Sequence, residues 1–169
     1  MCDLNYLKSA GVTHVLNTAE QHVSVSQARY AAHGIQYLGF HVDDLPHCNI
    51  SRFAKISHQH QCKVTTHSSI RYFHRTTEFI HRAVTGGGLV AVNCYMGLSR
   101  SASVVIAYLM TRHDMSLERV RLSDATREQV VILFILQALG FVKKSRNVRP
   151  NEGFVRQLKD LELSLKRRR

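Results

Sequence analysis

The sequence predicts an α/β protein built on a central, mostly parallel sheet flanked by helices. Short β-rich or wholly apolar runs alternate along the chain with stretches whose apolar residues recur at helical spacing, as in strand–helix–strand units. The chain has 169 residues, of which 44% are hydrophobic, which suffices for one domain with a sizeable core. No Pro- or Gly-rich linker divides it, so we expect a single domain over residues 1–169.

The first part of the chain alternates twice between helix and strand. Gly11 and Gly34 each follow a helical pattern and end it, because glycine readily adopts the conformation that closes a helix. β-Branched and aromatic residues dominate the segments after them, as strands favour. The elements predicted here are a helix over 5–10, a strand over 12–16, a helix over 26–33 and a strand over 35–42.

The remaining elements follow the same alternation. The run over 89–92 contains only apolar residues, as expected of a strand buried on both faces. The helical pattern before it is amphipathic and stops at three consecutive glycines, whereas the pattern after it is strongly apolar. The elements predicted here are a helix over 70–84, a strand over 89–92, a helix over 101–111 and a helix over 151–165.

The composition gives a formal net charge of +11. Such a charge indicates either an anionic partner, such as a phosphorylated substrate, nucleic acid or acidic lipid, or only a solubilising surface. The basic residues are dispersed and no nucleic-acid-binding motif is present, so we expect no nucleic-acid partner. No segment approaches the roughly 20 apolar residues of a membrane-spanning helix. The first residues lack a signal-peptide pattern, and we expect a cytoplasmic or nuclear location.

The cysteines do not form a recognisable disulfide or zinc framework. There are four, at irregular spacing and with no C-x-x-C pair: Cys2, Cys48, Cys62 and Cys94. A His-rich stretch around Cys62 could bind a metal adventitiously, but it lacks the paired spacing of a structural site. We therefore expect no metal and no cofactor.

The turn between the strand over 89–92 and the helix over 101–111 carries the chemistry. Cys94 follows the strand, and Arg100 stands six positions later where the helix begins. Backbone N–H groups and the helix dipole suit a phosphate there, and the planar guanidinium can bind two of its oxygens. Gly97 lets the backbone turn, and the positive field favours a nucleophilic thiolate. The alternative is that Cys94 is a small buried hydrophobe and Arg100 a capping cation.

This turn resembles the C-x5-R signature of the protein tyrosine phosphatase superfamily. The flanking residues over 97–103 and 107–110 resemble in particular the small atypical dual-specificity phosphatases. Residues 11–20 are similar to an early strand of that family, and residues 149–154 to its late loop-to-helix motif. The resemblance implies a protein tyrosine phosphatase-like fold of the dual-specificity phosphatase type.

The resemblance also implies a two-step reaction. The Cys94 thiolate attacks phosphorus to form a phosphocysteine, while Arg100 and the loop amides hold the equatorial oxygens. Ser101 matches the hydroxyl residue that assists departure of the cysteine. The phosphate-binding loop consists of Tyr95, Met96, Gly97, Leu98 and Ser99.

An acid must protonate the leaving oxygen and a base must then activate water, and the resemblance implies an aspartate in both roles. Asp44 takes the matching position once an apparent insertion is removed, and Asp43 beside it is the second candidate. Either aspartate could instead cap its loop. The mechanism needs no metal.

The sequence departs from the family pattern in three respects. Asn93 stands where the family has histidine; it retains donors and an acceptor but carries no charge, so we expect a slower reaction. Residues 52–70 and 120–137 interrupt the family pattern as apparent insertions. The second segment contains an apolar run that must be buried, bind a partner or promote aggregation. The third departure is a short N-terminus, and from it we expect that a helix and a strand of the family are missing. The insertions suggest an unusual splice form or translated intronic sequence.

Three functions follow from these observations. The first is a protein phosphatase that hydrolyses phosphotyrosine and phosphoserine or phosphothreonine in phosphorylated protein substrates. The second is a catalytically impaired pseudophosphatase that binds phosphopeptides. The third is a non-functional splice form.

Overall fold

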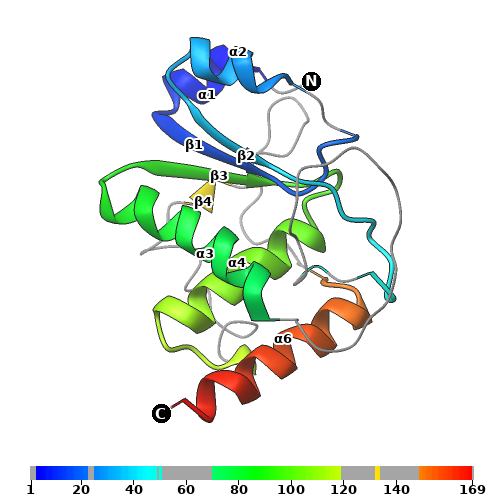
Figure 1. Cartoon of the computed structure of the whole chain (residues 1–169). Helices are drawn as coiled ribbons and strands as arrows, with labels where there is room; N and C mark the ends of the chain where they lie inside the picture. The colour runs from blue at the N-terminus through cyan, green and yellow to red at the C-terminus, as the bar shows by residue number, and fades with distance from the viewer. Residues whose placement is uncertain are drawn as a thin grey trace.

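The computed structural model describes residues 3–22, 25–48, 50, 70–118, 132–133 and 149–168. Its strands form a parallel sheet in the order β2-β1-β3-β4 (Figure 1). The strands are β1 (Val12–Asn17), β2 (Gln36–Gly39), β3 (Leu89–Asn93) and β4 (Ile132–Leu133). The sheet and its flanking helices confirm the predicted α/β class.

Helices cover both faces of the sheet (Figure 1). On one face lie α1 (Leu4–Ser9) and α2 (Gln27–Ala32); on the other lie α3 (Ile70–Thr85), α4 (Arg100–Arg112) and α6 (Glu152–Lys166). The described core accordingly has one cluster on each side.

The central strand β3 contributes to both clusters. Val90 and Val92 belong to the cluster around α3, α4 and α6, whereas Ala91 belongs to the cluster around α1 and α2. This alternation is the period of two that a strand imposes on its side chains. A strand that is buried on both faces needs apolar residues at every position, which explains the uninterrupted apolar run in the sequence.

Helix α4 is the most buried helix in the described structure. Each residue from Arg100 to Met110 is buried, because the helix packs against β3, α3 and α6. A helix that is enclosed on all sides is expected to be apolar around its circumference, as this sequence is. The position of Arg100, the first residue of α4, is thereby fixed by the core.

Strand β2 is shorter than the predicted strand over 35–42. After Gly39 the chain turns, the Phe40 N–H donates to the Asn17 carbonyl at 2.9 Å, and His41 forms an isolated antiparallel bridge with Ala19. The turn directs residues 41–44 across the carboxyl end of β1 rather than along the sheet.

The short strand β4 was not predicted from the sequence. It lies within the apparent insertion over 120–137, and it pairs with β3 through Val90 to Ile132 and Ala91 to Leu133. Part of the apolar run in that segment therefore serves as the edge of the sheet. The remainder of that insertion, and residues 52–69 of the other, lie outside the described residues. None of the helices in the described ranges has the length and apolar character needed to cross a bilayer.

Gly153 provides a test of how α6 packs against the loop that carries Asp44. A Cβ at this position would lie 1.8 Å from the Pro46 carbonyl oxygen, which is backbone and must shift. We predict that Gly153→Ala lowers the free energy of unfolding by about 1–3 kcal/mol, the cost of overpacking, although alanine is the better helix former. Urea denaturation measures the change. Lys159→Ala, on the exposed face of the same helix, is the control, and a Gly153→Ala protein of unchanged stability would contradict this packing.

Candidate active site

The loop over 94–99 connects β3 to α4 at the carboxyl end of the parallel sheet. Open α/β sheets bind ligands at this end. The neighbouring strand supports the loop, because the Thr18 N–H and hydroxyl both donate to the Asn93 carbonyl, at 2.8 and 3.0 Å. The sheet and the buried helix therefore fix both ends of the loop.

The Cys94 thiol is buried inside this loop. The Gly97 N–H donates to its Sγ at 3.0 Å, and the Ser101 hydroxyl lies 3.2 Å from the same atom. Gly97 has a positive φ of 70°, which turns the loop back over the sulfur and which a larger residue would strain to adopt. An N–H group and a hydroxyl therefore both lie within hydrogen-bond distance of the sulfur.

Arg100 directly follows the loop over 94–99, and its side chain is 6% exposed. One Nη donates to the Val42 carbonyl at 3.0 Å, which anchors the guanidinium. Its Nε is buried and makes no hydrogen bond with the described residues; the Asp44 carboxylate at 3.7 Å is an ion-pair partner but too distant to accept one. Buried donors are rarely left without an acceptor, so this nitrogen is available to bind an anionic oxygen.

Two hydrogen-bond donors hold Asp44 against the loop over 94–99. The Ser99 hydroxyl donates to its Oδ1 at 2.6 Å, and the Asn151 side-chain amide donates to that atom at 2.8 Å. Asn151 is also the N-cap of α6 and accepts from the Phe154 N–H at 3.0 Å. The loop, the aspartate and α6 are thus joined by one set of hydrogen bonds.

Asp43 faces elsewhere. Its carboxylate contacts His41 Nε2 at 3.0 Å, and its side chain is 54% exposed. The structure therefore brings Asp44, and not its neighbour, to Arg100 and to Ser99 of the loop.

Asn93 connects the loop to the strand beside it. Its amide donates to Asn17 Oδ1 at 3.1 Å, and the same oxygen accepts from the Ala19 N–H at 3.0 Å. Asn17 in turn donates to the Tyr37 hydroxyl at 3.3 Å. The uncharged amide thus ties the base of the loop to β1 and β2.

The rest of the loop forms its rim. The side chains of Tyr95, Met96 and Leu98 are exposed, and the Leu98 carbonyl accepts from the Arg149 N–H at 2.9 Å. Sequence reasoning placed these residues in the loop but omitted Asn151, Asn17 and the Val42 carbonyl from the site. Asn151 had a signal, since it belongs to the motif over 149–154. The Val42 carbonyl had none, because any residue supplies one.

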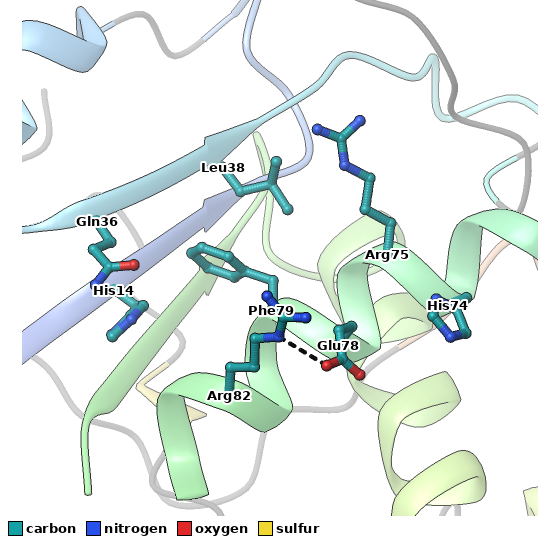
Figure 2. A pocket seen from close by; sticks show the side chains of 8 residues that line it. All are labelled: His14, Gln36, Leu38, His74, Arg75, Glu78, Phe79 and Arg82. Atoms are coloured by element: carbon teal, nitrogen blue, oxygen red, sulfur yellow. Dashed lines mark hydrogen bonds and ion pairs between the residues drawn. The ribbon is translucent and has the colours of Figure 1, made fainter. Parts of the chain in front are cut away.

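A separate cavity of about 410 Å³ lies between α3 and the edge of the sheet (Figure 2). Arg82 donates to Glu78 at 2.8 Å and lowers the pKa of that carboxyl, while burial lowers the pKa of His14. None of the side chains drawn there carries a thiol, and none belongs to the loop. Among the described residues, a thiol and anion-binding groups lie together only at Cys94.

Three side chains beside the loop over 94–99 could hold a metal ion: His22, His41 and Asp43.

The chain belongs to the family of dual specificity phosphatase catalytic domains, whose model matches residues 2–164. It is 32% identical over 161 residues to dual specificity protein phosphatase 26 of Homo sapiens, and equally to that of Mus musculus. Each alignment covers 95% of this chain and 59% of the relative, so the chain spans little more than half the length of these proteins.

Solved structures agree on the fold. The human tyrosine phosphatase-like serine/threonine/tyrosine-interacting protein superposes with a TM-score of 0.61 at 26% identity, over 96% of this chain and 84% of that one. Human DUSP28 superposes with a TM-score of 0.61 at 24% identity, over 98% and 87% of the two chains.

Asn93 allows a direct test of how the base of the loop affects the thiol. We predict that Asn93→His accelerates alkylation of Cys94 by iodoacetamide at neutral pH, because a histidine can carry a charge that favours the thiolate and asparagine cannot. The matched control is Asn5→His, the same substitution at an exposed position of α1, which should leave the alkylation rate unchanged. Equal or slower alkylation in Asn93→His would contradict the assigned effect of the asparagine.

Proposed function

We propose that the chain is a protein phosphatase that hydrolyses phosphotyrosine and phosphoserine or phosphothreonine through a phosphocysteine intermediate. The observation that carries the proposal is the geometry of one loop. It holds a buried thiol that accepts from the Gly97 N–H, and it ends at Arg100, whose buried Nε has no hydrogen-bond acceptor among the described residues. A phosphoryl group supplies both an electrophile for the sulfur and oxygens for the guanidinium.

In the first step Cys94 Sγ forms a bond to phosphorus as the bond from phosphorus to the substrate oxygen breaks. Arg100 and the loop amides stabilise the charge on the equatorial oxygens. Asp44 donates a proton to the departing oxygen; its bonds to Ser99 and Asn151 hold the carboxyl group beside the loop.

In the second step the same carboxylate accepts a proton from water as the water oxygen attacks phosphorus. The S–P bond breaks, inorganic phosphate leaves and the thiolate returns. Ser101, 3.2 Å from the sulfur, is placed to donate a hydrogen bond to the leaving thiolate. No step requires a group from outside the chain other than water.

Two observations support phosphoproteins as substrates. The exposed rim of Tyr95, Met96 and Leu98 places the loop near the surface, where a short phosphoserine and a long phosphotyrosine can both reach it. The net charge of +11 steers phosphorylated partners towards the protein, and the effect weakens as salt rises.

The uncharged Asn93 favours a second candidate, a phosphopeptide-binding module with little turnover. Its amide is engaged with Asn17, and it offers the loop no positive charge. The two functions differ in whether phosphate is released, and both require Arg100.

The phosphatase proposal is tested by turnover of an aryl phosphate and of phosphopeptides. We predict no turnover for Cys94→Ser, and a loss on the order of 100-fold for Asp44→Ala, as removal of a general acid causes. Asp43→Ala is the matched control, since that carboxylate faces His41, and it should retain turnover within a few-fold.

The opposite pattern, with Asp43→Ala impaired and Asp44→Ala active, would assign the acid to Asp43. Phosphopeptide binding that depends on Arg100 in a protein without turnover would establish the binding module instead.

Ser101 separates the two chemical steps. We predict that Ser101→Ala retains a rapid burst of aryl alcohol and then turns over slowly, because only the second step expels the cysteine thiolate. Stopped-flow measurement with an aryl phosphate resolves the burst. The matched control is Ser103→Ala, two residues along the same helix, whose hydroxyl donates to the carbonyl of the N-cap residue Ser99 and not to the sulfur. A Ser101→Ala enzyme with an unchanged steady-state rate would contradict this role.

A further inference from the structure

Three side chains beside the phosphate-binding loop form a cluster that the phosphatase reaction does not use. They are His22, His41 and Asp43, and one ligand atom from each lies within 4.8 Å of the other two. His41 Nε2 is 3.0 Å from Asp43 Oδ1, and the rings of His22 and His41 have centroids 5.2 Å apart. Two imidazoles and one carboxylate are the donor set of many divalent transition-metal sites.

The backbone brings these residues together before any ion binds. His22 lies in the turn after β1, where its N–H donates to the Ala19 carbonyl at 2.9 Å. His41 forms the antiparallel bridge with that same Ala19, and Asp43 follows two residues later. A binding site that is formed in advance loses less entropy when a ligand arrives.

The spacing suits a zinc ion. Zn–N and Zn–O bonds of about 2.0–2.2 Å place neighbouring ligand atoms of a tetrahedral site roughly 3.3 Å apart. The contact of 3.0 Å between His41 and Asp43 is close to that value, and the exposed His22 ring lies beside His41, with 5.2 Å between the ring centroids.

We propose that His22, His41 and Asp43 bind a divalent transition-metal ion, with Zn²⁺ as the ion that their chemistry fits. The ion has three protein ligands and an open fourth position that water fills. It joins the turn after β1 to the loop after β2. Because Asp43 immediately precedes Asp44, the bound ion restrains the segment that carries the proposed general acid.

The site also borders the phosphate-binding loop. The His22 ring lies 5.6 Å from the Tyr95 ring, centroid to centroid, so a bound ion adds positive charge at the rim where a phosphorylated substrate approaches. Binding of the ion itself does not depend on the chemistry of Cys94.

The test measures Zn²⁺ binding by titration calorimetry in the Cys94→Ser protein, which removes the competing thiolate of the loop. We expect each chain to bind one ion. The affinity for that ion should fall at least about tenfold in His22→Asn and in Asp43→Asn, since the loss of even a residue that only hydrogen-bonds to a ligand lowers metal affinity that much. His47→Ala, an exposed histidine of the same loop outside the cluster, is the control and should bind unchanged. The histidines around Cys62 are present in every variant and give a common background.

A second readout is thermal stability. Zn²⁺ should raise the unfolding midpoint of Cys94→Ser and of its His47→Ala variant, and should raise it less in the His22→Asn and Asp43→Asn variants. Equal binding and equal stabilisation across all four proteins would place the ion elsewhere and overturn the proposal, as would the absence of binding. Either result leaves the phosphatase assay unaffected, because that assay depends on Cys94 with no metal added.

Discussion

A buried positive charge at the N-terminus of α4 is the constraint on which the site depends. Arg100 is the first residue of that helix, where the helix dipole already carries partial positive charge and disfavours a cation. One Nη is anchored on the Val42 carbonyl, but within the described ranges Nε has only the distant Asp44 carboxylate. The arrangement becomes favourable when a dianion binds, since the guanidinium, the loop N–H groups and the dipole then all act on one ligand.

The same constraint explains why the surrounding elements are joined as they are. Burial of α4 holds Arg100 in place, and the sheet holds Cys94 six residues before it. Asp44 approaches because the chain leaves β2 after Gly39 and crosses the end of β1. Asn151 then ties that aspartate to α6, so that three segments far apart in sequence meet at one carboxylate.

The local parts of this site could be predicted from the sequence. The strand, turn and helix from Leu89 to Arg112 are encoded by consecutive residues, and their apolar and polar pattern identifies the loop between them. Asp44 was preferred to Asp43 only through the family resemblance, because adjacent positions do not show which carboxylate meets Ser99 and Asn151 in space. The pairing of Ile132 with Val90 was missed for the same reason, since a short apolar run fits a strand, a helix or an interface equally well.

The phosphocysteine intermediate is tested by measuring the covalent state of Cys94 during turnover. The protein is mixed with a phosphopeptide, quenched within milliseconds in acid, digested and analysed by mass spectrometry. We predict a phosphate adduct on the peptide that contains Cys94. The amount of this adduct should increase when Ser101 is replaced by alanine. Release of phosphate with no adduct on that peptide, or with the adduct on another residue, would contradict it.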